Sequence, residues 1–537
     1  MTAAVLSLHL KPTITVSPGG RHLAADQAIR ELLQAKVPLY QRDFAIVSVA
    51  HVTAKNADGE AFEVPGIVKV TGPMLARALG QSADWSRYDA RSKKPVFIDP
   101  PNPVVQQILG MVGEWPFAPL NGIIQCPTLR RDGTLLDQEG YDERTGLVLV
   151  NAIDMPPIAA SPSREDAQSA LDLLSGLLSE FPFADDETSR AVALSTILTP
   201  VLRAAMEVAP MHLTTAPLAG TGKSYLADIA AMIATGDRCA VKAVSPSPEE
   251  TEKRLIGSAL EGHPIVALDN CRELLQGDFL CQITERPLLS LRALGKSDMH
   301  RISNSFVFFA NGNNTTVAED MVRRTIRCAL DANVEHPETR EFAGNPLATV
   351  RRDRGKYVAA CLTIARAYVA AGRPAQLAPL LSFEDWSSIV REPLAWLNCG
   401  DPVASQETLR SDDPRKIETT VIFEAWKSAC GIGKQQSRTT KEVIEFANAQ
   451  VANKQSGTET DLWEALFAVA SKRHSPERKI DPTALGKWLA AHRGTIAAKC
   501  KLMVDDTDRT RPRWYLDWLA GSAGSAGYFH SHSKNCH

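Results

Sequence analysis

The stretch MHLTTAPLAGTGKS, residues 211–224, decides the fold of this chain. Its first half, His212–Ala216, is a short apolar run that predicts a strand, and the residues from Lys223 to Ala234 have the spacing of a helix. Gly236 comes next, and glycine is the usual residue just beyond a helix C-terminus. A strand, a glycine-rich turn and a helix in this order predict a loop whose backbone N–H groups converge on phosphate oxygens.

The residue types of this turn indicate a site for ATP and Mg²⁺. Gly220 and Gly222 let the backbone bend around an anion, and the ammonium of Lys223 suits the β- and γ-phosphates. The Ser224 hydroxyl is a natural Mg²⁺ ligand. Pro217 stands where such loops usually have their first glycine, but proline also holds a turn. The alternative is a glycine-rich turn with an incidental lysine. The predicted nucleotide-binding residues are Pro217, Leu218, Ala219, Gly220, Thr221, Gly222, Lys223, Ser224 and Tyr225.

Beyond the turn, short apolar strands alternate with amphipathic helices. This alternation is typical of an open, mainly parallel sheet that helices cover, so we expect the α/β class. The predicted strands are His212–Ala216, Arg238–Val244, Pro264–Asp269, Ser305–Ala310 and Arg327–Asp331.

A magnesium-binding acid is expected at the end of a second buried strand. The segment Pro264–Asp269 reads PIVALD, and Asp269 is predicted to hold Mg²⁺ through a water. An apolar run ending in aspartate is common, and only its pairing with the phosphate loop makes this one specific. The next residue, Asn270, can orient an attacking water but cannot take its proton, although phosphoryl transfer depends chiefly on positioning and charge stabilisation. Glu273 and Glu285 are candidate substitutes for the base, and we expect slow hydrolysis if neither serves.

An amide and an arginine are also expected around the phosphates. The apolar run at 306–310 leads to Asn311, Asn313 and Asn314, and an amide there can sense the γ-phosphate; we favour Asn313 over the other two. An ordinary Asn/Gly turn is the alternative.

The helical stretch Asp320–Arg327 then carries a double arginine. Arg323 or Arg324 would reach the ATP of a neighbouring subunit as an arginine finger, whose removal lowers turnover by about 10³–10⁵. A surface ion pair is the alternative.

Taken together, these motifs resemble an AAA+ ATPase of the helicase superfamily-3 kind, the replication ATPases of viruses, phages and plasmids. In that family a hairpin between the acid and the amide lines the central pore of a ring. The segment Leu288–Ile302 reads as such a hairpin with its tip at Gly295–Asp298. The resemblance implies that its basic tip residue follows the phosphate backbone of a nucleic-acid strand; a plain surface hairpin is the alternative. The implied nucleic-acid residues are Lys296, Arg292, His300 and Arg301.

The wider chain is similar to proteins of prophages and mobile elements that are often labelled primase or helicase. The similarity covers most of residues 70–520, but only the ATPase motifs carry a mechanism, and no pattern of polymerase carboxylates supports a primase. The stretches that carry the similarity are WSRYD at 85–89, GEWPF at 113–117, PTLR at 127–130, GYD at 140–142 and DPVAS at 401–405.

Around the ATPase core we expect several further domains, because 537 residues exceed one ordinary domain. The predicted layout is a small N-terminal α/β domain of unknown role at 1–155, a linker and helical segment at 156–210, an AAA+ ATPase core with a parallel sheet at 211–345, a helical region at 346–455, a winged-helix-like domain at 456–519 and a flexible tail at 520–537.

The predicted winged-helix-like domain is locally basic. From Ser471 to Arg513 there are eleven Lys/Arg and five Asp/Glu, beside Trp488, Trp514 and Tyr515. Arginines on a β-wing could dock on duplex phosphates. A protein-docking module and an ordinary solvated face are the alternatives.

The composition of the chain indicates which classes of function are unfavoured. The 59 Lys/Arg against 62 Asp/Glu give a net charge of -3, which does not by itself indicate a nucleic-acid binder. No apolar run approaches the roughly 20 residues of a membrane span, and the 10 cysteines are scattered without CxxC pairs. We therefore expect reduced thiols, no membrane partner and a cytoplasmic protein.

The sequence thus predicts an ATP hydrolase that acts as an oligomeric, hexamer-like ring on single-stranded or forked DNA, as a replicative DNA helicase of a phage or mobile element. One alternative is an ATP-switched replication initiator or helicase loader without processive unwinding. Another is an ATPase that remodels proteins or acts in defence.

Overall fold

The computed structural model describes residues 11–55, 61–243, 248–271, 274–292, 299–375, 377–452, 462–471, 478–505, 507 and 511–519. The chain divides into two compact units. The first comprises Met1–Thr315 and Asp320–Gln406, and the second comprises Thr316–Glu319 and Glu407–His537. The helical region that the sequence places at 346–455 is therefore shared between the two units.

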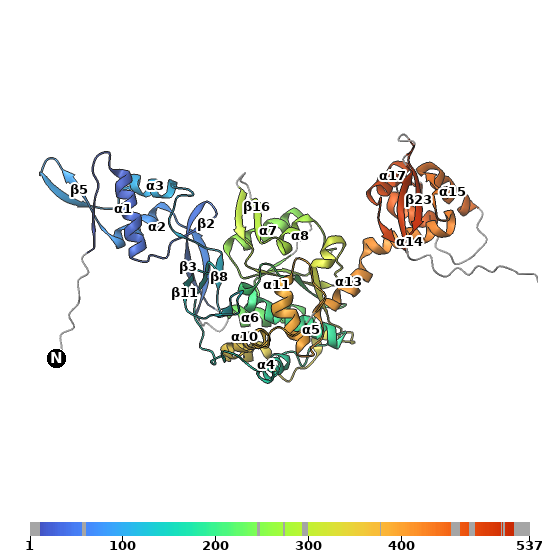
Figure 1. The fold of residues 1–537 in the computed structure, drawn as a ribbon, viewed down its shortest axis with the longest axis horizontal. Coiled ribbons are helices and arrows are strands. Elements are labelled where there is room, and N and C mark those ends of the chain that lie inside the picture. Colours follow the sequence, from blue (N-terminus) through green and yellow to red (C-terminus); the bar gives the residue numbers. More distant parts are fainter. Residues whose placement is uncertain are drawn as a thin grey trace, which may run out of the picture. The chain divides into compact units, whose positions relative to one another are not determined.

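A five-stranded parallel sheet lies at the centre of the first unit (Figure 1). Its strands, in spatial order, are β14 (Val241–Ala243), β15 (Ile265–Asp269), β18 (Val307–Asn313), β13 (Met211–Ala216) and β19 (Thr325–Ala329). The connection after β13 runs toward β14, whereas the connections after β15 and β18 run the opposite way. Open α/β sheets bind ligands at the carboxyl ends of their strands, where the direction of connection reverses.

The α/β class and all five predicted strands are confirmed, with shifted ends. β18 continues to Asn313 because it pairs with β13 as far as Ala216. The predicted helix Asp320–Arg327 is wrong: a 3₁₀-helix, η2 (Glu319–Arg324), is followed directly by β19. Pairing with β13 overrides the helical spacing there, because it buries Thr325 and its neighbours in the sheet.

Apolar helices pack on this sheet and on one another. α5 (Asp186–Leu202) contacts both α6 (Lys223–Thr235) and α10 (Arg354–Ala370). α5 continues through Pro200, because a proline so close to the C-terminus removes only one late backbone hydrogen bond. Trp386 is fully buried in this core. The other helices of this region are α4 (Arg164–Gly176), α7 (Pro248–Glu261), α8 (Asp278–Glu285), α9 (Pro346–Arg352), α11 (Glu384–Trp386), the π-helical η4 (Ser387–Arg391) and α12 (Glu392–Trp396).

The described residues between 11 and 155 form both helices and strands. Helices α1 (Arg21–Gln34), α2 (Gly72–Ser82) and α3 (Asn102–Gly110) bury one apolar cluster. Their strands are β1 (Thr13–Thr15), β2 (Tyr40–Arg42), β3 (Ala45–Lys55), β4 (Ala61–Lys69), β5 (Asp84–Asp89), β6 (Lys94–Ile98), β7 (Ala118–Pro119), β8 (Gly122–Ile124), β9 (Thr128–Leu129), β10 (Leu135–Leu136), β11 (Gly140–Asp142) and β12 (Leu147–Leu149).

A buried arginine joins this N-terminal region to a helix beside the parallel sheet. Arg42 donates hydrogen bonds to the carbonyl oxygens of Leu260 at 2.8 Å and Ala259 at 3.2 Å, in the last turn of α7. The carbonyls of the last turn have no N–H partner within the helix. A cation at this position therefore satisfies them and interacts favourably with the negative end of the helix dipole. Burial lowers the pKa of Arg42 to about 10, against the raising effect of Asp43.

The second unit combines helices with an antiparallel sheet. The unit begins before residue 456, the predicted start of the winged-helix-like domain, because it also takes in α14 and α15. α13 (Ser405–Asp412) leads into it. Its elements are α14 (Pro414–Cys430), α15 (Thr440–Ala452), α16 (Leu462–Ala470), α17 (Pro482–Ala491), β20 (Arg438–Thr439), β21 (Ile496–Ala497), β22 (Cys500–Asp505) and β23 (Arg513–Trp518).

The described residues lack two features. None of their helices is both long and apolar enough to cross a bilayer. They also contain no group of three or more His, Cys, Asp or Glu side chains that could hold a metal ion by themselves.

Candidate nucleotide-binding site

The phosphate loop connects β13 to α6 in the predicted way. Gly220 and Gly222 have φ values of 79° and 100°, in the left-handed region that favours glycine. A Cβ atom on Gly220 would lie 2.9 Å from the backbone nitrogen of Glu338, so a side chain there would also collide with the segment that covers the loop. Gly236 ends α6 with φ 86°, as predicted.

The Lys223 ammonium lies inside this loop. It donates to the carbonyl oxygen of Leu218 at 2.9 Å and to the Thr221 hydroxyl at 3.3 Å. Burial lowers the pKa of Lys223 from its ordinary value, and the negative charge of Asp269 opposes that shift. The loop thus holds a partly desolvated cation beside the N-terminus of α6, where an anion is favoured.

The predicted magnesium-binding residues lie next to each other. Asp269 ends β15, and the Ser224 hydroxyl donates to its Oδ1 atom at 3.3 Å. A hydroxyl and a carboxylate are oxygen ligands of the kind that Mg²⁺ prefers. The two residues are 45 positions apart in the sequence and meet because β13 and β15 flank β18 with their carboxyl ends at one edge.

β18 brings two asparagines to this edge, and Asn311 is the one that joins the phosphate loop to Asp269's strand. Asn311 Oδ1 accepts a hydrogen bond from the backbone N–H of Asn270 at 3.1 Å, and its Nδ2 donates to Ser224 Oγ at 3.4 Å. Asn313, which the sequence favours, also lines the cavity. The sequence identified Asn311 as one of three candidate asparagines, but only the strand register shows which groups its side chain contacts.

Gly312 lets the end of β18 approach the residue after Asn270. A Cβ atom at Gly312 would lie 2.0 Å from the carbonyl oxygen of Cys271 and 2.1 Å from the Thr315 hydroxyl oxygen. Thr315 donates to that same carbonyl at 2.6 Å. The close contact fixes the position of both asparagines.

The candidate general bases have different surroundings. Glu273 lies outside the described residues. Glu285 is not among the residues that line the cavity and instead accepts a hydrogen bond from Ser382 at 2.7 Å. In the described part of the chain, the carboxylates that do line the cavity are Asp172, Glu180 and Asp269.

The two predicted finger arginines both pair with Glu285 in the same chain. Arg324 Nε donates to Glu285 Oε2 at 2.6 Å, and its side chain is only 6% exposed. Arg323 Nη2 lies 3.2 Å from the same oxygen, with its side chain 42% exposed. Burial raises the pKa of Glu285, but Ser382 and the two arginines outweigh it, so the net pKa is lowered.

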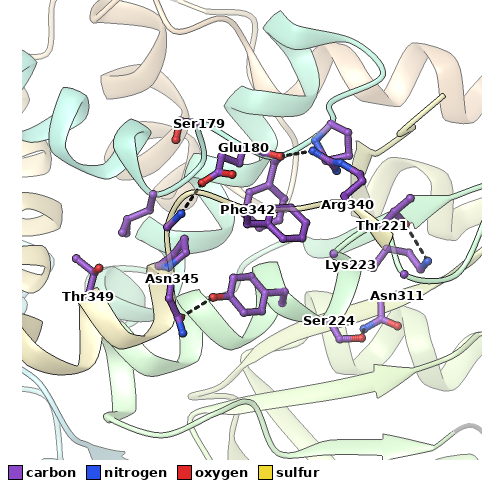
Figure 2. A pocket seen from close by; sticks show the side chains of 18 of the residues that line it. Ser179, Glu180, Thr221, Lys223, Ser224, Asn311, Arg340, Phe342, Asn345 and Thr349 are labelled. Atoms are coloured by element: carbon purple, nitrogen blue, oxygen red, sulfur yellow. Dashed lines mark hydrogen bonds between the residues drawn. The ribbon is translucent and has the colours of Figure 1, made fainter. Parts of the chain in front are cut away.

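Opposite the phosphate loop, the cavity extends well beyond the space that phosphates need. Its volume is about 1070 Å³, and its far wall is formed by the end of α4, the residues 179–182 and the segment 340–349. Figure 2 shows Phe342, Arg340 and Glu180 on that side and Lys223 and Ser224 on the other.

We call the segment 340–349 the strap. The Glu180 carboxylate accepts hydrogen bonds from the backbone N–H groups of Ala343 at 2.9 Å and Gly344 at 3.0 Å, which anchors the strap to the end of α4. Arg340 donates to the carbonyl oxygen of Glu180 at 2.8 Å and lies over the Phe342 ring at 5.1 Å.

The other end of the strap is tied to α6. The Tyr225 hydroxyl donates to Asn345 Oδ1 at 3.0 Å and accepts from the backbone N–H of Leu347 at 3.3 Å. Sequence reasoning named Tyr225 only as part of the loop and missed the strap, because nothing in the linear sequence relates it to residues 120 positions away.

The predicted hairpin is present as β16 (Leu288–Arg292) paired with β17 (Met299–Ser303). Its tip, Gly295–Asp298, lies outside the described residues, and with it Lys296. His300 Nδ1 lies 2.7 Å from Asp43 Oδ2, and the backbone N–H of Arg301 donates to Asp43 Oδ1 at 3.1 Å. Asp43, in the N-terminal region, therefore contacts the half of β17 that is nearer the hairpin tip.

No protein-family model matches the chain, and no curated protein matches it. Among solved structures, the A form apo structure of the NrS-1 C-terminal region is similar at 12% identity and a TM-score of 0.35, covering 84% of this chain and 100% of that chain. The X-ray structure of JCV helicase is similar at 11% identity and a TM-score of 0.19, covering 47% and 73%. At such TM-scores these similarities assign neither a fold family nor a function.

Proposed function

We propose that the cavity binds Mg·ATP and that the protein is an ATP hydrolase. The observation that carries this proposal is the convergence of Lys223, Ser224, Asp269 and Asn311 at one edge of the parallel sheet, beside a large cavity. A chance glycine-rich turn would not bring a lysine and a hydroxyl at the start of α6 together with a carboxylate and an amide from two strands.

The residues fit a phosphate chain and its metal. Phosphate oxygens would replace the carbonyl of Leu218 as partners of the Lys223 ammonium, in stronger, charge-assisted hydrogen bonds. Ser224 and Asp269 would hold Mg²⁺, which neutralises the charge of the β- and γ-phosphates when bound. Asn311 would orient these two residues and the water near the γ-phosphate.

The far wall of the cavity suits the nucleoside. Phe342 offers a ring for stacking, and Arg340 lies against that ring. The strap would therefore let the site recognise the nucleoside as well as the phosphates.

The proposal also includes two features that the sequence resemblance implies, an arginine finger and a DNA-binding hairpin. An oligomeric, hexamer-like ring would let Arg323 of one subunit reach the nucleotide of the next, since its side chain is partly exposed beside Glu285. The β16–β17 hairpin, with Lys296 at its tip and Arg292, His300 and Arg301 on its strands, would contact single-stranded or forked DNA. The protein would then act as a DNA helicase in replication of a phage or mobile element.

A second candidate function is an ATP-driven switch, such as a replication initiator or helicase loader. The specific observation in its favour is Asn270, which adjoins Asp269 and has a positive φ of 57°. An amide in that position cannot accept the proton of the attacking water, and slow hydrolysis suits a switch better than a motor. A fork-unwinding assay separates the two candidates.

The Lys223→Ala variant tests the ATPase assignment. We expect it to abolish ATP hydrolysis, because the phosphates lose their main cationic partner. The measurement is phosphate release at saturating Mg·ATP. Lys253→Ala, at an exposed lysine that pairs with Glu250 on α7, is the matched control and should hydrolyse ATP at the wild-type rate. Full turnover by Lys223→Ala would refute the site.

A further inference from the structure

One sheet of the N-terminal region has an open face that the ATP site does not use. β1, β5 and β6 pair in the order β1–β5–β6. Ile14 and Trp85 are buried on the side that packs into the apolar cluster of α1, α2 and α3. Side chains alternate between the two faces of a strand, so the neighbouring residues Thr15 and Ser86 belong to the opposite face.

Two aromatic side chains stand on this opposite face. In the register of β5 and β6, Ser86 lies opposite Phe97 and Tyr88 lies opposite Pro95, so Tyr88 and Phe97 are diagonal neighbours on one face. Tyr88 is 60% exposed and Phe97 is 73% exposed. The sheet backbone holds the two exposed rings at a fixed spacing.

The end of the same hairpin is positively charged. Arg87, Arg91, Lys93 and Lys94 are in no ion pair within the described residues. The one acid among them, Asp89, has its carboxylate occupied by the backbone N–H groups of Arg91 and Ser92. These hydrogen bonds close the turn and leave the cations available to an external anion.

We propose that this β1–β5–β6 face binds single-stranded nucleic acid, with bases stacked on Tyr88 and Phe97 and phosphates near Arg91 and Lys93. Aromatic rings beside a basic groove or edge are the means by which proteins hold single strands without reading their sequence. The faces of the bases are free in a single strand but are stacked inside a duplex.

The polar character of the rest of the face favours this ligand over a protein partner. Thr15 is exposed on this face, and its hydroxyl is 3.0 Å from that of Ser86, a buried residue to which it is hydrogen-bonded. The core of a protein interface needs a contiguous apolar patch, whereas bases need separate rings with polar surroundings for the sugar and phosphate.

Fluorescence anisotropy of a labelled oligo-dT strand with the full chain, in the absence of nucleotide, tests the proposal. We expect Tyr88→Ala and Phe97→Ala each to weaken binding about tenfold or more, and Phe97→Trp to retain it, because stacking needs only an aromatic ring. Phe44→Ala, at another exposed phenylalanine (62%) in the same region, is the matched control and should bind like wild type. Lys93→Ala should reduce the dependence of binding on salt.

Photo-crosslinking with 5-iododeoxyuridine strands locates the contact, because the hairpin of the proposed motor would also bind DNA. We expect crosslinks in the peptide that carries Tyr88 or Phe97, and we expect them unchanged in Lys223→Ala. The proposal for the ATP site and the proposal for the β1–β5–β6 face can thus be refuted independently. Wild-type affinity of the Tyr88→Ala/Phe97→Ala double variant, or crosslinks confined to other peptides, would overturn the proposal. So would a double variant that loses self-association or vesicle binding instead of strand binding.

Discussion

At the scale of single residues, the site depends on one amide that bridges the Ser224 hydroxyl and the backbone of Asn270. Asn311 accepts from the backbone of Asn270 and donates to Ser224, so it fixes the distance between the phosphate loop and the end of β15. Its side chain is buried, and a buried amide without partners would be unfavourable. Asn313 lies two residues further on, where β18 ends.

We therefore expect Asn311→Ala to lower ATP turnover by about 10²-fold, the usual effect of removing one preorganised polar group at a reacting centre. The variant also leaves the Asn270 N–H without its acceptor. Asn313→Ala is the matched comparison. Steady-state hydrolysis of both variants, together with nucleotide affinity, distinguishes positioning from binding. A larger defect in Asn313→Ala would mean that the distal amide is the sensor.

At the scale of elements, the strap and the end of α4 form the far wall of the cavity, where we propose that the nucleoside binds. The anchor is a single carboxylate, because Glu180 accepts from two successive N–H groups of the strap. The opposite end is tied through Tyr225 to α6, the helix that begins with the phosphate loop. The two halves of the cavity are thus linked by hydrogen bonds as well as by the sheet.

The Glu180→Ala variant should release the strap and weaken Mg·ATP binding about tenfold, while leaving the binding of Mg-tripolyphosphate unchanged. The reason is that the phosphate loop does not contact the Glu180 carboxylate. Isothermal titration with the two ligands measures the difference. Glu165→Ala, on the exposed first turn of α4, serves as the control. Equal losses for both ligands would show that Glu180 supports the phosphate loop instead of the far wall of the cavity.

At the scale of the whole molecule, the exposure of Arg323 and Arg324 indicates which of them could act on a neighbouring subunit. Glu285 holds Arg324 almost fully buried, whereas Arg323 remains partly exposed. Breaking the Arg324 pair would leave a buried charge unpaired, so Arg323 is the better candidate for an arginine finger. Such a residue would complete a neighbouring subunit's site and would make hydrolysis a property of the oligomer.

Mixing two inactive variants tests this. Arg323→Ala should bind ATP but hydrolyse it about 10³-fold or more slowly, the usual effect of losing an arginine finger. Mixed with Lys223→Ala, it should regain part of the activity, because some interfaces then combine an intact loop with an intact arginine. Size-exclusion chromatography confirms co-assembly. No recovery in co-assembled mixtures would argue against action between subunits.

Much of the fold was predictable from local pattern. The phosphate loop, the strand ending at Asp269 and the β16–β17 hairpin are where the sequence predicts them, because each depends on residues adjacent in the chain. The predicted helix at Asp320–Arg327 failed because pairing with β13 outweighs a local helical spacing. The strap could not be predicted, since its contacts join residues from distant segments.

The amino-acid order by itself determined the α/β class and the glycine-rich turn between a strand and a helix, because glycine conformation and apolar periodicity act over a few residues. Only the tertiary structure decided which asparagine meets Ser224, that Glu285 holds both arginines, and that a strap closes the cavity. Those contacts depend on strand order and packing, which the whole chain sets through the burial of its core.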